Sequence, residues 1–156
     1  MRRTDREVTN PEKINEIIRA CSCCRLGFYD GHEVYIVPLN FGFEEADGRR
    51  IFYFHGAKKG RKIDLMASHP SVGFELDTNF AIHPGENACS YSARFQSVIG
   101  TGRVSLLEDP EEKRHGLQLL MRQNSGRDEW EFPDSALASV AVFQLVVESI
   151  SCKEHP

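Results

Sequence analysis

The chain has 156 residues, of which 40% are hydrophobic and 27% charged, and its net charge is −4 at pH 7. This length and composition fit one globular domain, which we expect to span residues 1–156. The composition excludes wholesale disorder, and the negative charge disfavours a globally basic nucleic-acid binder. We therefore expect a single folded domain that has no nucleic-acid partner.

Cysteine usage and the N-terminal segment bear on the cellular compartment. The five cysteines are odd in number, and Cys21, Cys23 and Cys24 are clustered, which makes a poor disulfide framework. No second cysteine pair completes a zinc site, so we expect no metal and mainly structural thiols. The N-terminus lacks a signal-like apolar segment, and no stretch reaches the ~20 apolar residues of a membrane span. The expected location is the cytoplasm, with no membrane partner.

A helix is predicted first along the chain. Asn10 and Pro11 have the residue types of a helix cap and a first helical position. Apolar residues then recur with spacings of three, four and seven, which indicates one buried face. These residues are Ile14, Ile17, Ile18 and Cys21. The helix is expected to end near Cys23–Cys24.

Strand signals dominate the rest of the chain. The first predicted strand, residues 26–29, is followed by Asp30-Gly31, a strong hairpin turn signal. Gly100 and Gly102 lie inside a long alternating run and suggest a bulge or a close backbone approach. The predicted strands cover residues 26–29, 34–40, 51–54, 72–76, 91–107 and 140–150.

Between these strands lie two further helices and two loops. Residues 62–69 are compatible with a short helix that Pro70 stops. Asp109, followed by Pro110 and an acidic first turn, opens a second amphipathic helix. Residues 78–88 and 125–135 lack periodicity and are predicted as loops. Strands that cluster, without long alternating helices, predict a mainly β protein with a small antiparallel barrel.

One loop combines several features of a phosphate site. The segment His55–Lys62 follows a bulky strand and precedes the short helix, and four of its last five residues are cationic. Its two glycines allow the backbone to approach a ligand closely, and a helix start offers free N–H groups. A phosphate would gain these donors together with a forked arginine. The alternative is a solvated basic loop. The pattern is neither a Walker A loop nor a Rossmann fingerprint.

The same segment carries a family resemblance. Residues 53–62, followed by His69-Pro70-Ser71-Val72, resemble the flavin-binding split-barrel family of pyridoxamine 5′-phosphate oxidase. Further motifs are similar to its nitroimidazole-resistance (Nim-type) branch. They are Met1-Arg2-Arg3, Asp5-Arg6-Glu7, residues 35–41, Tyr91-Ser92 and residues 97–102. The resemblance implies a six-stranded antiparallel split β-barrel that forms a homodimer with FMN at the interface.

The resemblance also assigns site residues. Arg61 and Lys62 match the pair that holds the FMN phosphate, while His55 and Gly56 match the strand end beside the flavin. His55 is the one titratable group expected near the ring, where it could act catalytically or simply pack. The remaining expected cofactor contacts are Pro38, Leu39, Asn40, Ala57, Lys58, Gly60, Ser97, Val98 and Trp130. Ser97 stands where the oxidase family has glutamine, and the oxidase's C-terminal substrate segment has no match, which argues against pyridoxamine phosphate as substrate.

The expected function follows from this cofactor. We expect an FMN flavoprotein, an oxidoreductase that passes electrons from a reduced nicotinamide (NADH or NADPH) to a small acceptor such as a nitroaromatic or 5-nitroimidazole. Two alternatives stay open. One is a haem-binding or haem-degrading split barrel with His55 as ligand. The other is a non-catalytic flavin-binding redox sensor that uses Cys21, Cys23 and Cys24.

Overall fold

The structure, a computed structural model, describes residues 3–156. Met1 and Arg2 of the opening motif lie outside the described residues. Within these, one mainly antiparallel sheet has eight strands, so the mainly β prediction is confirmed and the count of six is corrected. The strands are β1 (Glu7–Val8), β2 (Cys24–Tyr29), β3 (Val34–Leu39), β4 (Gly42–Ala46), β5 (Arg49–Gly56), β6 (Ser71–His83), β7 (Ser92–Leu107) and β8 (Ala141–His155).

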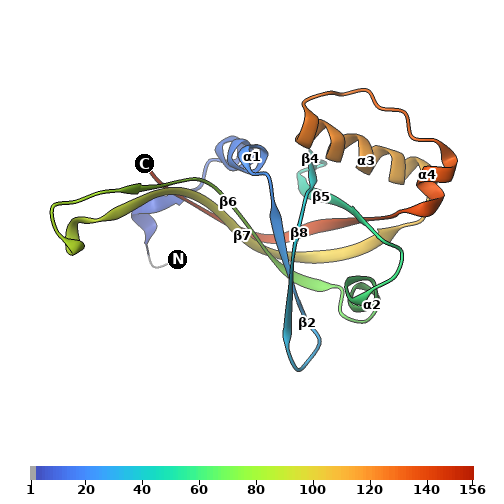
Figure 1. The fold of residues 1–156 in the computed structure, drawn as a ribbon, viewed down its shortest axis with the longest axis horizontal. Helices are drawn as coiled ribbons and strands as arrows, with labels where there is room; N and C mark the ends of the chain where they lie inside the picture. The colour runs from blue at the N-terminus through green and yellow to red at the C-terminus, as the bar shows by residue number, and fades with distance from the viewer. Residues whose placement is uncertain (1–2) are drawn as a thin grey trace.

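The helices flank this sheet (Figure 1). They are α1 (Pro11–Ala20), α2 (Arg61–Ser68), α3 (Pro110–Ser125) and α4 (Asp134–Ser139), with 3₁₀ turns at Thr4–Arg6 and Ala88–Ser90. The strand order is β3-β2-β6-β7-β8-β5-β4, and β1 pairs with β8 outside this path. The long strands β6, β7 and β8 therefore form the centre, and the shorter strands extend the sheet on both sides.

Two hydrophobic clusters hold the elements together. The larger lies on one face of the sheet, where the isoleucines of α1 and the apolar side of α2 pack against β2, β5, β6, β7 and β8. Phe52 lies at its centre, with ring centroids 5.2 Å from Phe43, 5.4 Å from Phe74 and 5.5 Å from Phe41. The smaller cluster lies under α3 and α4. It contains Ile51, Tyr53, Leu107, Leu117, Leu137 and Val142.

The first helix begins as predicted and ends earlier. The Asn10 side chain accepts a hydrogen bond of 3.0 Å from the Lys13 N–H, which caps the helix. The helix stops at Ala20, and not at Cys23–Cys24, because the backbone becomes extended at Cys21. Cys24 then pairs with Leu39 in the sheet. Strand pairing therefore overrides the helical pattern over the last few residues.

The predicted loop over residues 78–88 is wrong in its first half. β6 continues to His83, and residues 81–83 pair with residues 92–94 of β7. An irregularity between Thr78 and Ala81, with Asn79 at φ 55°, marks where the ribbon leaves the body. We call residues 79–94 the arm; it projects well beyond the rest of the molecule (Figure 1). Its neighbour in the sheet, and not its own sequence pattern, makes this segment a strand.

The segment after α3 also differs from the prediction. Asp109 caps α3 by accepting hydrogen bonds of 2.9 and 3.0 Å from the backbone N–H groups of Glu111 and Glu112, as expected. The last two residues of the predicted loop 125–135 belong to α4, a short helix that was not predicted from the sequence. α4 buries Leu137 in the smaller cluster, so tertiary packing stabilises it.

Candidate functional site

The basic loop lies between β5 and α2, where the sequence predicted it. Gly60 has φ 132°, a conformation that favours glycine, and its carbonyl accepts from the N–H groups of Ile63 and Asp64 at 2.9 and 3.2 Å. The backbone N–H groups of Arg61 and Lys62 precede these first helical bonds and have no helical acceptor. The helix start therefore presents two N–H donors to a ligand, with the positive end of the helix behind them.

Gly56 and Lys62 form a close pair at the mouth of this loop. A Cβ atom added at Gly56 would lie 2.6 Å from the Lys62 ammonium nitrogen and 2.8 Å from its neighbouring carbon. The Lys62 side chain therefore lies directly over the Gly56 backbone. Glycine at position 56 is what allows the ammonium group to reach the end of β5, so these two predicted site residues do meet.

Arg61 is held by the β2–β3 turn. Its guanidinium lies 4.9 Å from the centre of the Tyr35 ring, 3.5 Å from an Asp30 carboxylate oxygen, and in an ion pair with Glu33. The Glu33 carboxylate raises the Arg61 pKa further, so the side chain stays charged. Exposed ion pairs of this kind are weak because water screens the charges. A phosphate at the start of α2 can therefore replace a carboxylate as the partner of Arg61.

The acidic residues around Arg61 were missed from the sequence. Asp30 was identified only as part of a hairpin turn, and its carboxylate does accept from the His32 and Glu33 N–H groups at 2.9 Å. These two bonds hold the Asp30 pKa below its usual range. Tyr35 lies in a segment that the family resemblance included. The signal available was therefore the turn motif, but its contact with Arg61 is a tertiary feature.

We call Gly56 together with Gly60–Lys62 the cradle. His55, Ala57 and Lys58 are exposed beside it. His55 pairs with Val142 near the start of β8, so its position is fixed by the sheet. Lys58 borders an open cleft of about 360 Å³, and His55 is not among the residues that line it. The cleft is lined by Lys58, Leu106, Leu107, Glu108, Lys113, Val140 and Ala141. Its lining combines apolar side chains with two lysines and the Glu108 carboxylate, and the Lys113 ammonium already donates to the Leu137 and Val140 carbonyls.

Pro38 and Leu39 of β3, and Asn40 directly after this strand, lie away from the cradle. Pro38 is exposed on an edge strand, where its missing N–H costs no sheet hydrogen bond. Leu39 packs partly into the larger cluster. The Asn40 side chain donates to Asn124 at 3.1 Å, which ties it to α3. Arg61 contacts Tyr35, near the opposite end of β3. Within one chain, residues 38–40 therefore lie apart from the cradle.

Ser97 and Val98 lie in β7 between β6 and β8, on opposite faces. Val98 is fully buried in the larger cluster, so its side chain cannot line a ligand. Ser97 lies on the other face, beside Asp77 and Lys153. Val142, the partner of His55, pairs on its other side with Leu107 of β7. Leu107 lies ten residues after Ser97, which is roughly 30 Å along a strand. Ser97 is therefore remote from His55 within one chain.

Trp130 is separate from both groups. It lies in the segment between α3 and α4, on the opposite side of the sheet from α2 (Figure 1). The Arg127 guanidinium lies 4.4 Å from the centre of the Trp130 ring. The Trp130 carbonyl accepts a hydrogen bond from the Gln118 side chain. Its buried indole N–H has no hydrogen-bond partner among the described residues. The structure places Trp130 against α3 and not at the basic loop.

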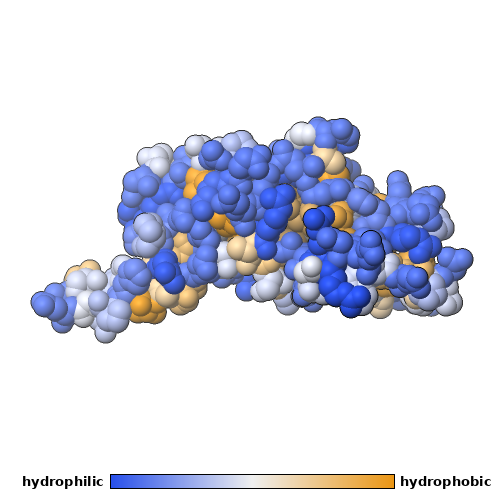
Figure 2. All heavy atoms as spheres, turned by 90° about the horizontal axis from the view of Figure 1, so that it is seen from above, coloured by the Kyte–Doolittle hydropathy of each residue, from blue (hydrophilic) through white to orange (hydrophobic). Residues whose placement is uncertain are grey.

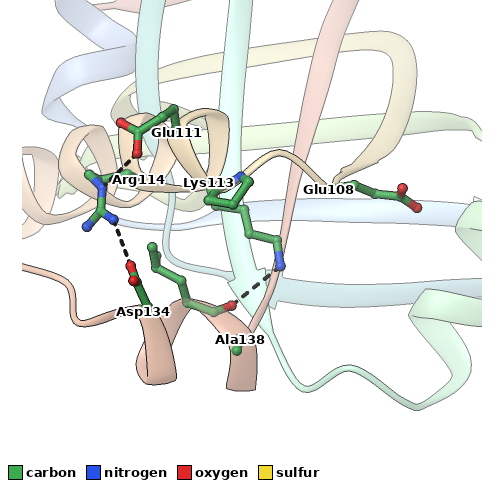
Figure 3. Close-up of a pocket in the computed structure, with 8 residues that line it drawn as sticks. Glu108, Glu111, Lys113, Arg114, Asp134 and Ala138 are labelled. Atoms are coloured by element: carbon green, nitrogen blue, oxygen red, sulfur yellow. Dashed lines mark hydrogen bonds and ion pairs between the residues drawn. The ribbon is translucent and has the colours of Figure 1, made fainter.

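A larger hollow of about 550 Å³ lies between α3 and α4, and the charged side chains that line it pair with one another (Figure 3). Arg114 pairs with Glu111 at 3.5 Å and with Asp134 at 3.3 Å. Lys113 donates to the carbonyl of Leu137 at 3.4 Å, near the end of α4. These groups satisfy one another, so they stabilise the helix pair and offer little to a ligand.

The cysteines divide by burial. Cys21, Cys24 and Cys152 are buried, Cys23 is half-buried and Cys89 is exposed. Burial raises the pKa of the Cys21 thiol to about 12 and that of Cys152 to about 11, and it raises the Cys24 pKa as well. The thiolate is the reactive form, so these three thiols should be inert at neutral pH.

A thiol-labelling experiment checks this division. At pH 8 the folded protein should react quickly at Cys89 and more slowly at Cys23, while Cys21, Cys24 and Cys152 react only in denaturant. Because the folded-state Cys152 pKa is raised from 9.0 to about 11, its stabilising contribution is full below pH 9 and is lost as the pH rises toward 11. Rapid labelling of Cys21 or Cys24 in the native protein, read by mass spectrometry, would contradict the assignment.

The comparison with known proteins agrees with the sheet. The sequence matches the family described as pyridoxamine 5′-phosphate oxidase over residues 10–154. The chain belongs to this family. No functionally curated protein matches it at a significant level. The family resemblance stated from the sequence is thereby confirmed, and so is the split-barrel fold class.

Solved structures of other family-like proteins share this fold. A candidate 5-nitroimidazole antibiotic resistance protein from Bacteroides thetaiotaomicron has 30% identity and a TM-score of 0.81, over 94% of this chain and 85% of that one. This likeness supports the Nim-type branch. A flavocytochrome from Azotobacter vinelandii (19% identity, TM-score 0.80) covers 100% and 72% of the two chains. A FAD- and haem-binding protein from Mycobacterium smegmatis (14%, 0.80) covers 96% and 73%, and these two likenesses concern the fold alone.

Proposed function

We propose that this member of the pyridoxamine 5′-phosphate oxidase family binds FMN, with its phosphate at the start of α2. The observation that carries the proposal is the convergence of two free N–H donors with the Lys62 ammonium over Gly56. Arg61 supplies a second cation, which can exchange its exposed carboxylate partners for the phosphate. The flavin ring would then extend from the phosphate toward His55 and the open cleft.

The proposed reaction is reduction of a small acceptor by a reduced nicotinamide. Bound FMN supplies the redox chemistry, and the chain's own residues bind and orient it. A nitroaromatic acceptor is supported by the 30% identity to the Bacteroides protein described for 5-nitroimidazole resistance. His55 is proposed as the proton donor, since its side chain is exposed and its strand fixes its backbone.

The proposed assembly is a cytoplasmic homodimer. One chain separates Ser97 from His55 by roughly 30 Å along β7, so a flavin site that uses both needs residues from two chains. No helix in residues 3–156 is both long and apolar enough to cross a membrane. The separation of Ser97 from His55 within one chain is the support for the homodimer.

The visible absorption spectrum of the purified protein tests the cofactor. We expect the two-band spectrum of a flavin, with FMN identified by mass after release, followed by nicotinamide-driven reduction of a nitroimidazole. A single intense Soret band would instead favour the haem alternative with His55 as ligand. A colourless protein that also fails to bind added FMN would refute the proposal. The redox-sensor alternative is weakened by the buried, high-pKa thiols of Cys21 and Cys24.

The variant His55→Ala tests the catalytic role. We expect it to retain FMN and to oxidise nicotinamide normally, while kcat for nitro reduction falls by about 10²-fold, the lower range for loss of a positioned acid. The matched control is His69→Ala, since His69 is also exposed and contacts the Ser68 hydroxyl at the end of α2. Unchanged kcat in His55→Ala would assign His55 a packing role.

A further inference from the structure

The two cations of the cradle have different surroundings. Among residues 3–156, Lys62 has no carboxylate partner, and its ammonium lies over the end of β5. Arg61 instead contacts two carboxylates and an aromatic ring, all of which belong to the β2–β3 hairpin. The carboxylates are those of Asp30 and Glu33, which precede Arg61 by 31 and 28 positions. One of the two cations proposed to hold the phosphate therefore already has anionic partners within the chain.

Both carboxylates approach one nitrogen of the Arg61 guanidinium. The Glu33 carboxylate pairs with Nη2, and an Asp30 carboxylate oxygen lies 3.5 Å from the same nitrogen. A guanidinium can form a fork in two ways, through Nε with Nη2 or through Nη1 with Nη2. Arg3 forms the first of these forks with Asp5, at 2.8 and 2.6 Å. Because Nη2 belongs to both forks, a phosphate held by two donors of Arg61 competes directly with Glu33.

The turn that carries the two acids holds them in place to different degrees. One Asp30 oxygen accepts hydrogen bonds of 2.9 Å from the His32 and Glu33 backbone N–H groups. The other Asp30 oxygen faces Arg61, so this carboxylate cannot turn away without losing both bonds. The longer Glu33 side chain is 64% exposed and can leave the guanidinium. The turn therefore presents one fixed and one displaceable negative charge beside the cradle.

The Tyr35 ring keeps the Arg61 guanidinium at the hairpin whichever anion it binds. The guanidinium carbon lies 4.9 Å from the centre of this ring. This cation–π contact uses none of the five N–H donors of the arginine, so it survives an exchange of anions. Arg61 therefore stays beside the turn when a phosphate replaces Glu33, and Glu33 can return when the phosphate leaves.

The size of the resulting effect on affinity follows from the competition. The measured dissociation constant equals the intrinsic constant divided by the fraction of molecules in which the Arg61 fork is free. An exposed ion pair changes an equilibrium constant by about fivefold at most. Competition by Glu33 should therefore weaken phosphate binding by a factor of this size and should not abolish it.

We propose that the β2–β3 turn is an internal competitor for the FMN phosphate, in which Glu33 occupies Nη2 of Arg61 and must leave before both cations hold the phosphate. The inference rests on the proposed function, because the phosphate is that of FMN. It adds that the chain itself limits the affinity of the site. Asp30 and Glu33 are affinity-determining residues that do not bind the cofactor, and FMN is an exchangeable cofactor of this protein.

The first test measures FMN affinity of the apoprotein by quenching of flavin fluorescence. Glu33→Gln keeps the length of the side chain, removes its charge and should bind FMN about threefold more tightly than the wild type. Unchanged or weaker FMN binding by Glu33→Gln would overturn the proposal.

The matched control is Glu16→Gln in α1. The Glu16 side chain is 66% exposed and pairs with Lys13 at 3.3 Å, so this variant removes the same charge from an equally exposed ion pair. The side of the molecule that carries α1 and α3, seen from above, is largely hydrophilic (Figure 2), and α1 lies apart from α2 (Figure 1). Glu16→Gln should leave the FMN dissociation constant unchanged. An equal gain in both variants would show a general charge effect and would overturn the proposal.

The second test asks whether Glu33 acts through Arg61. In an Arg61→Ala background Glu33 has no guanidinium to occupy, so adding Glu33→Gln should tighten FMN binding by less than about 1.5-fold. The same gain with and without Arg61 would mean that the carboxylate only repels the phosphate, which would overturn the competition.

Inorganic phosphate separates this inference from the proposed function. Isothermal titration calorimetry of the wild type and of Glu33→Gln with inorganic phosphate probes the cradle without a flavin. Tighter phosphate binding by Glu33→Gln, with no FMN binding by either protein, would refute the proposed function and support the internal competitor. FMN binding that Glu33→Gln does not tighten would overturn the competitor alone. Binding of neither ligand by either protein would overturn both.

Discussion

Replacing Arg61 and Lys62 together by alanine is expected to weaken FMN binding at least about a hundredfold. A hydrogen bond to a charged group contributes about 1.5–3 kcal/mol, and the variant removes two such donors from the phosphate. Lys62 is the closer of the two to the cradle, since its ammonium lies over Gly56. Titration of the apoprotein with FMN, followed by quenching of flavin fluorescence, measures the loss.

The control for this experiment is Lys59→Ala. Lys59 lies in the same loop and is fully part of its basic run, but it precedes Gly60 and the helix start. Removing it lowers the general positive charge without removing a donor from the cradle. Equal losses in Lys59→Ala and in the double variant would mean that the loop attracts anions only diffusely. Wild-type affinity in the double variant would place the phosphate elsewhere.

Phe52→Ala is expected to lower the free energy of unfolding by about 3–5 kcal/mol, the usual range for truncating a buried phenylalanine. The Phe52 side chain is fully buried, and three aromatic rings surround it within 5.5 Å between centroids. Its loss leaves a cavity where β4, β5 and β6 meet, which the rigid sheet cannot close. Urea denaturation followed by tryptophan fluorescence gives the free energy.

Leu106→Ala serves as the comparison for this stability measurement. Leu106 is 41% exposed on β7, so truncating it should cost about 1 kcal/mol or less. Similar losses for the two variants would show that the cluster around Phe52 is loosely packed. A destabilisation of Phe52→Ala below that of Leu106→Ala would contradict the assignment of Phe52 to the centre of the core.

The basic loop could be predicted from the sequence because its information is local. Gly60, Arg61 and the start of α2 are neighbours in the chain, so the turn, the positive charges and the free N–H groups follow from short-range rules. The same reason explains the caps at Asn10 and Asp109. Family motifs added the cofactor expectation and the split barrel, which composition alone does not indicate.

The arm could not be predicted because its structure depends on a partner strand. Phe80 and Ile82 are apolar but exposed, so residues 79–83 bury neither large side chain in this chain, and their pairing partner is β7. Helix α4 is similar, since a six-residue helix is stable only through packing of Leu137. In each case a long-range contact overrides weak local preference.

The placement of the predicted site residues shows the same division. Local rules predicted Gly56 and Lys62, and the fold brings them together. The burial of Val98 and the distance of Ser97 from His55 depend on how β6, β7 and β8 pair, which no short segment encodes. The contact of Arg61 with Asp30 likewise joins residues 31 positions apart. Residue spacing along the chain predicts local features such as the basic loop. Strand register determines which residues from distant parts of the chain come close together.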